Sequence, residues 1–85
     1  MKMLPAGDRV VLRVAIITKK DDQGNETQDI SREAKVVESN SADIKKGMVV
    51  YYNPRGCINV EAMSTKKYVF LIADACDIYG IVKYE

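Results

Sequence analysis

Two carboxylates and a thiol lie close together in the sequence ADACD, at residues 73–77. Neighbouring carboxylates act as general acid and general base only when their surroundings separate their pKa values. Nothing beside Asp74 and Asp77 in the sequence indicates a raised pKa, and the chain contains no histidine, the commonest general base. We therefore expect a solvated turn here rather than a catalytic site, and a protein that is not an enzyme.

The two cysteines, Cys57 and Cys76, fall short of the four ligands of a structural zinc site. They fit either a single disulfide or two free, buried thiols in a reducing cytoplasm, and we expect the thiols. Gly24 and Gly56 each stand alone, without the spacing of a loop that holds a phosphate. The sequence thus predicts neither a metal nor a cofactor.

Tyrosines are the remaining side chains with a possible binding role. In small β-barrels they stack on the bases of single-stranded nucleic acid, but they also suit strands and interfaces, with a buried ring and a wet hydroxyl. The net charge is only +1, and Lys66-Lys67 is the only basic pair near them. We expect the second role, and neither nucleic acid nor a membrane as a partner, with a nucleic-acid-binding barrel as the alternative. The five tyrosines are Tyr51, Tyr52, Tyr68, Tyr79 and Tyr84.

These side chains are carried by short runs rich in β-branched and aromatic residues, which are typical of strands. Turn residues separate the runs, and the clearest signals are Gly47, where we expect a positive φ, and the stretch Asn53-Pro54-Arg55-Gly56. Residues 34–39 fit a strand or a helix equally well. The pattern predicts one all-β domain over residues 1–85, a barrel or a sandwich. The expected strands are residues 8–17, 48–53, 57–62, 68–73 and 78–84.

Residues 18–33, TKKDDQGNETQDISRE, form a polar segment that contains one strongly apolar side chain, Ile30. Most connections in compact domains have about 4–6 residues, so this length favours a functional loop over an idle one. Gly24-Asn25 marks a flexible apex. We expect a long flexible loop between the first two strands.

The first and last predicted strands carry apolar residues on both faces. A strand at the edge of a small domain normally alternates, and an exposed apolar edge promotes association. Head-to-tail pairing would cover both strands, the first of one subunit beside the last of the next, and such a contact forms a ring when its rotation closes. The sequence therefore predicts a homo-oligomer.

Four stretches resemble, in order, the motifs of the GroES-like co-chaperonin family. GDRVVLRV at residues 7–14 resembles its opening strand, and AKVVESN at residues 34–40 is similar to its G-x-V-x-x-V-G. IKKGMVVYYN at residues 44–53 resembles V-x-x-G-D-x-V-x-F-N, and KYVFLIADACDIYGIV at residues 67–82 resembles the family's ending. The resemblance covers nearly the whole chain.

The resemblance implies a small GroES-like β-barrel that assembles into a sevenfold ring and caps a GroEL-like chaperonin. The polar segment then corresponds to a mobile loop that binds the chaperonin apical domains and orders on contact. In place of the family's apolar tripeptide the chain has Gly24-Asn25-Glu26, so Ile30 is expected to be the main anchor, helped by Ile17. The chaperonin-binding residues are expected to be Gly24, Asn25, Glu26, Thr27, Gln28, Asp29, Ile30 and Ser31.

The family's subunits are held together by the first strand of one and the last strand of its neighbour. The resemblance implies an interface of Val10, Leu12 and Val14 against Ile81, Val82 and Tyr84 of the next subunit. The chain shows neither a signal peptide nor a long apolar run, which predicts the cytoplasm, or a host cytoplasm if the protein is virus-encoded. A ring-forming virion or shell protein would use the same edges, and is the other alternative.

Overall fold

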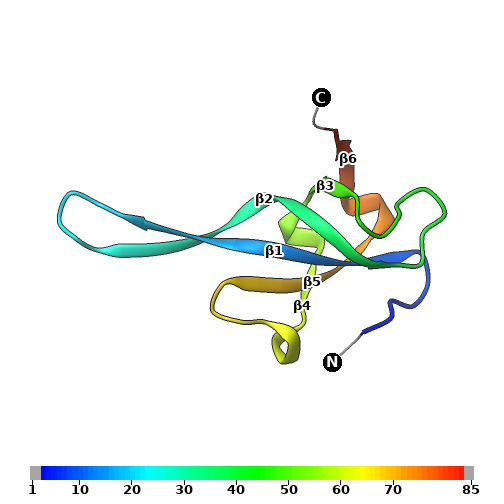
Figure 1. Cartoon of the computed structure of the whole chain (residues 1–85), viewed down its shortest axis with the longest axis horizontal. Coiled ribbons are helices and arrows are strands. Elements are labelled where there is room, and N and C mark those ends of the chain that lie inside the picture. The colour runs from blue at the N-terminus through cyan, green and yellow to red at the C-terminus, as the bar shows by residue number, and fades with distance from the viewer. Residues whose placement is uncertain (1–2, 84–85) are drawn as a thin grey trace.

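The computed structural model describes residues 3–83 and contains one antiparallel sheet of six strands in the order β4-β5-β1-β2-β3-β6 (Figure 1). The all-β prediction is confirmed. The sheet is open among the described residues, because β4 and β6 are its two edges. The strands are β1 Arg9–Lys20, β2 Glu26–Ser39, β3 Val49–Tyr52, β4 Ile58–Asn59, β5 Tyr68–Asp74 and β6 Ile78–Val82.

The core lies on one face of β1 and of its two neighbours. Leu12 is fully buried and stands opposite Val36 of β2 and Leu71 of β5. Because strand side chains alternate between faces, Val10 and Val14 point to the same side, and both are also fully buried. The other members of the buried cluster are Ala34, Ile44, Val50, Tyr52 and Ala73.

β1 lies inside the sheet and not at its edge. β5 pairs with it along Arg9–Ala15, and β2 pairs with it along its other side. β1 therefore offers no free edge along Arg9–Ala15, which argues against the predicted contact of Val10, Leu12 and Val14 with a neighbouring subunit. The apolar side chains of Val10–Val14 are covered within the chain. The residues that stand beside them lie about 20 to 60 positions away in the sequence.

β6 does lie at an edge, because among the described residues it pairs only with β3. Ile81 is 43% exposed there, and Val82 is half-buried. Tyr84, the third residue predicted for this side of the interface, lies outside the described residues. β6 therefore has a free edge among the described residues, and the contact predicted for it with a neighbouring subunit stays a prediction.

The segment predicted as an irregular loop is instead the outer part of the β1–β2 hairpin. β1 continues to Lys20 and β2 begins at Glu26, so only residues 21–25 connect them. The prediction failed because a two-stranded ribbon with both faces in water has no apolar alternation to reveal it. The alternative left open for residues 34–39 is resolved as a strand, in the second half of β2.

The shorter connections follow the turn signals. Gly47 has a φ of 94°, the left-handed conformation expected from the sequence. The Asn53-Pro54-Arg55-Gly56 stretch forms a 3-10 turn, η1 Pro54–Gly56, and two further 3-10 turns, η2 Glu61–Met63 and η3 Ala75–Asp77, precede and follow β5. The strand expected at 57–62 is shorter in the structure. Only its residues Ile58–Asn59, which form β4, pair with β5.

Candidate functional site

A two-stranded arm extends from the body of the protein, and we define it as Ile16–Lys20 of β1 and Glu26–Ile30 of β2 with the turn between them. It forms the long projection in Figure 1. β5 pairs with β1 only as far as Ala15, and β3 pairs with β2 only from Glu33 onward. Beyond Ile16, whose backbone N–H bonds to Lys67 O, the backbone of each arm strand is therefore paired only with the other strand among the described residues, and its outer edge is open to a partner.

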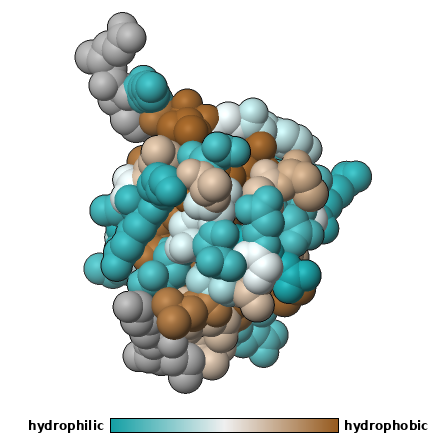
Figure 2. Space-filling model, turned by 90° about the vertical axis from the view of Figure 1, so that its right-hand side faces the viewer, coloured by the Kyte–Doolittle hydropathy of each residue, from teal (hydrophilic) through white to brown (hydrophobic). Residues whose placement is uncertain are grey.

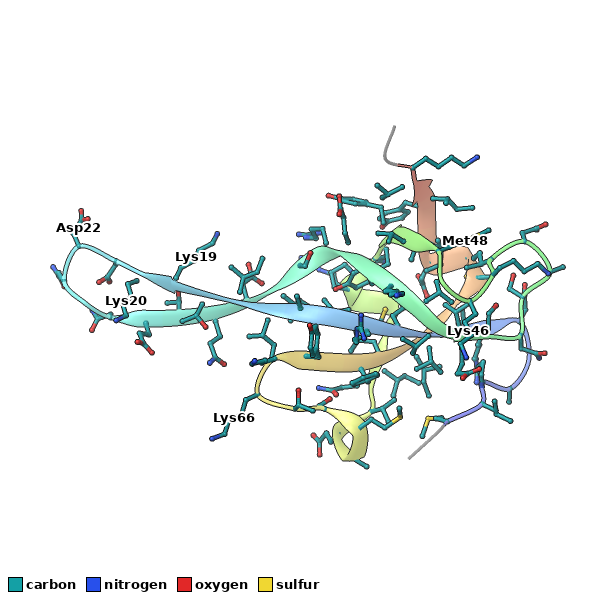
Figure 3. The ribbon with its side chains drawn as sticks, in the orientation of Figure 1. Lys19, Lys20, Asp22, Lys46, Met48 and Lys66 are labelled. Atoms are coloured by element: carbon teal, nitrogen blue, oxygen red, sulfur yellow. The ribbon has the colours of Figure 1, made fainter. Side chains whose placement is uncertain are left out.

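The tip of the arm is a polar turn organised by Asp21. Its carboxylate accepts hydrogen bonds from the backbone N–H of Gln23 at 2.9 Å and of Asn25 at 2.8 Å. The hydrogen bond from Asn25 is the main cause that lowers the pKa of Asp21, with burial acting in the opposite direction. Lys19, Lys20 and Asp22 project into solvent around the tip (Figure 3). The tip therefore offers charge and hydrogen bonds rather than an apolar anchor.

Apolar side chains gather at the root of the arm. Ile30 stands opposite Ile16 and packs against the buried core, so it is half-buried rather than free. These two side chains and Val69 line a shallow pocket of about 210 Å³, together with Gln28 and Asp29. The main anchor predicted from the sequence is thus partly engaged by the protein's own core.

Ile17 is the more accessible isoleucine of the arm, with 41% of its surface exposed. It pairs with Asp29 and follows Ile16, so its side chain points to the opposite face of the ribbon. The sequence analysis gave Ile17 only a supporting role. Its exposure depends on the hairpin, which no local pattern indicated.

The arm joins the body at an irregularity of the β1–β2 ladder. The register shifts between Val14 and Ile16, so that Ser31–Glu33 of β2 stand opposite the single residue Ala15. The hydroxyl of Tyr52 donates a hydrogen bond of 2.7 Å to the carbonyl oxygen of Ser31 at this point. The sequence analysis missed this contact, because its partners are far apart in the chain.

An aromatic and apolar surface accompanies the free edge of β6. The rings of Tyr51 and Tyr79 lie 6.5 Å apart, and the two residues are 43% and 65% exposed.

A second exposed apolar side chain lies near the other end of the chain. Leu4, in the segment that precedes β1, is 70% exposed. Figure 2 shows apolar surface next to both grey ends of the chain. Exposed apolar patches of this kind mark sites of association.

The carboxylates that opened the sequence analysis come together in space with Cys76. One ligand atom from each of Asp74, Cys76 and Asp77 lies within 4.8 Å of the others. Arg9 Nε donates a hydrogen bond of 2.8 Å to Asp74 Oδ1, so one carboxylate already has a cationic partner. The group is solvent-exposed or half-buried, as expected for a turn.

Cys57 lies near this group, and its half-buried thiol donates a hydrogen bond of 3.3 Å to the carbonyl oxygen of Asn53. Burial, helped by the negative charges of Asp77 and Asp74, raises the pKa of Cys57 to about 11. The thiol is therefore protonated at neutral pH, where neither metal binding nor nucleophilic attack by a thiolate is favoured. Both cysteines are free, but the expectation that both thiols are buried is wrong, because Cys76 is exposed and Cys57 is only half-buried.

A second aromatic surface lies on the outer face of β5. The guanidinium carbon of Arg13 sits 4.9 Å from the centre of the Tyr68 ring, and Phe70 stands opposite Arg13. Tyr68 is 38% exposed. Two aromatic residues on one strand face, beside an arginine, form the kind of surface that stacks on bases.

In residues 3–83 we find no helical segment with the length and apolar character needed to cross a membrane. Comparison of the chain with protein-family models and with curated proteins gave no match. The case for a function therefore depends on the sequence motifs and on the geometry of the arm and the β6 edge.

Proposed function

We propose that the protein is a co-chaperonin, a cytoplasmic ring that caps a GroEL-like chaperonin and assists ATP-dependent protein folding without catalytic activity of its own. The observation that carries the proposal is the arm. It is formed by the outer parts of β1 and β2 and projects from an all-β body, in the region of the chain where the GroES-like resemblance puts the loop that contacts the chaperonin. The order of the four sequence motifs along the chain agrees with it.

The arm gives the lid its contact with the chaperonin. Ile17 supplies exposed apolar surface, and burying one isoleucine contributes about 1.5–3 kcal/mol. One such contact is weak, but several arms on one ring bind together, and multivalency makes the capping firm while each contact stays reversible. Reversibility suits a lid that leaves in every ATP-driven cycle.

Assembly of the ring uses the free edge of β6. Since β1 is already paired on both sides along Arg9–Ala15, this part of the chain is not free to cover β6 of a neighbour. Residues 3–7 precede β1, form no strand and expose Leu4. We propose that this segment of one subunit lies along Ile78–Val82 of the next, so that Leu4 reaches the surface around Ile81.

The oligomeric state tests the assembly. Seven copies of the 9.5 kDa chain total about 67 kDa. Ile81→Asp places a charge at the proposed contact and should give single chains, while Ile58→Asp, at the opposite edge and with 63% exposure, should leave the ring intact. Native mass spectrometry distinguishes the three proteins. A wild-type protein that stays a folded monomer at micromolar concentration would refute the ring.

Capping is tested separately, with ring-competent protein. Ile17→Asp should abolish binding to a chaperonin in the presence of nucleotide, because it removes the exposed apolar side chain of the arm. Thr18→Asp, a neighbouring exposed position without apolar surface to lose, serves as the control. Equal loss in both variants, or in neither, would remove Ile17 from the mechanism. Narrow NMR lines for the arm that do not change with chaperonin would refute the contact itself.

The surface formed by Tyr68, Phe70 and Arg13 favours a second candidate, a module that binds single-stranded nucleic acid. Stacking of a base on an aromatic ring contributes about 1–3 kcal/mol, and phosphate contacts make the affinity fall steeply with salt. Titration of a labelled oligonucleotide at two salt concentrations tests this. Salt-sensitive binding that Tyr68→Ala abolishes would favour the module over the lid.

A further inference from the structure

The arm and the body are separated by an irregular stretch whose backbone is bonded locally. The Ser31 hydroxyl accepts a hydrogen bond of 3.2 Å from the N–H of Glu33, and the Asp29 carboxylate accepts one of 2.8 Å from the N–H of Ile30. Side chains that bond their own backbone in this way compete with the ladder between strands. The direction of the arm relative to the sheet is therefore not set by a continuous ladder from β1 to β2.

Tyr52 reaches this stretch from β3. Its side chain is fully buried in the core, and its hydroxyl donates the 2.7 Å hydrogen bond to Ser31 O. The ladder between β3 and β2 ends at Glu33, so the hydroxyl carries the connection of β3 to β2 two residues further toward the arm. A buried hydroxyl without a partner is costly, which favours the arrangement that keeps this bond.

On the other side of the arm root, β1 has a second support. The backbone N–H of Ile16 donates a hydrogen bond of 3.0 Å to Lys67 O, just before β5 begins. Each strand of the arm is thus held to the body at its root, β1 through a backbone bond and β2 through the Tyr52 side chain. Of these two supports only the second can be removed by a change of side chain.

We infer that Tyr52 is a positioning residue, whose hydroxyl fixes the direction of the arm by holding the carbonyl group of Ser31. The inference gains its functional meaning from the proposed lid, because arms held at one angle can reach their sites on a chaperonin together. The physical claim concerns the free chain alone. Loss of the hydroxyl loosens the arm and leaves the body folded.

Hydrogen exchange of the free protein, followed by mass spectrometry, tests this claim. Tyr52→Phe removes only the oxygen atom and keeps the buried ring. Loss of one ordinary hydrogen bond should speed the exchange of the arm amides, in Ile16–Lys20 and Glu26–Ile30, by about two- to tenfold. Amides of the body, in Val10–Val14, should change by less than about twofold. Tyr51→Phe is the matched control, since Tyr51 is the adjacent tyrosine and its side chain is exposed.

An arm that exchanges at the same rate in Tyr52→Phe and in the wild type would overturn the inference. Equal acceleration in the arm and the body, or a Tyr52→Phe chain that does not fold, would also overturn it, because the hydroxyl would then support the whole core. No chaperonin takes part in this measurement, so its outcome is independent of the proposed function. If the arm loosens in Tyr52→Phe as expected, but the wild-type protein caps no chaperonin, the lid is refuted and the role of Tyr52 remains.

Discussion

Substitution of Gly56 by alanine should destabilise the protein, although Gly56 lies in an exposed turn. A Cβ atom at this position would overlap the Asp77 carboxyl group, with its carbon and both oxygens closer than real Cβ contacts allow. Asp77 belongs to η3, and its carbonyl oxygen accepts a hydrogen bond of 2.8 Å from the N–H of Asn53, so the two turns are joined. The carboxyl group can make room only by rotating away or by shifting this junction.

The expected magnitude follows from two opposing effects. Overpacking costs about 1–3 kcal/mol, and replacing glycine by alanine at an ordinary φ gains about 0.4–1 kcal/mol through the unfolded chain. Gly56 does not have a positive φ, so both effects apply, and because the overlapping atoms end a side chain that can rotate, the net loss is at most about 1 kcal/mol. Gly80 supplies the control, since its φ is not positive and no atom lies within 4 Å of its Cβ position. Gly80→Ala should stabilise the protein by about 0.4–1 kcal/mol.

Urea denaturation followed by circular dichroism measures both changes, at one protein concentration because association affects apparent stability. Asp77→Ala removes the overlapping atoms, so the double variant Gly56→Ala/Asp77→Ala should be more stable than the sum of the single changes predicts, by about 1 kcal/mol. Additive effects within about 0.3 kcal/mol would refute the overlap. So would a Gly56→Ala protein that is as stable as Gly80→Ala.

Three further predictions concern titration and reactivity. The pKa of Asp21 is lowered from 3.8, so its carboxylate stabilises the arm turn fully above pH 3.8, and this stabilisation is lost as the pH falls through the lowered pKa. In an acid titration the amide chemical shift of Asn25 should change with the protonation of Asp21. The same change should be absent from Asp21→Asn. A disulfide-exchange reagent should modify exposed Cys76 quickly at pH 8 and Cys57 only slowly, because burial raises the pKa of Cys57 to about 11; two fast thiols in the folded protein would contradict its burial. Burial raises the pKa of Tyr52 from 10.0 to about 12, so the protonated hydroxyl contributes fully to the stability of the folded state below pH 10, and this contribution is lost as the pH rises toward 12. Absorbance should show one tyrosine that ionises later than the others. This late step should be missing from Tyr52→Phe, and its persistence would assign it to another residue.

The amino-acid sequence by itself determined the β class and most strand positions, because these depend on local composition. Runs of valine, isoleucine and tyrosine indicated β3, β5 and β6 to within about two residues, and Gly47 took the conformation expected of it. The polar segment at 18–33 also overlaps most of the arm, although the sequence predicted a loop there and not two strands. These features arise from neighbours in the chain.

Tertiary structure alone decided which strand is central and what the polar segment becomes. β1 has no free edge because β5, some sixty residues later, pairs with it, and no local pattern reports such a partner. The polar segment forms a hairpin because hydrogen bonds across the ribbon, and not a buried face, order it. The contact between Tyr52 and Ser31 likewise needs β3 beside β2. Pairing between distant segments is a property of the whole chain, which is why the sequence could show the strands but not their neighbours.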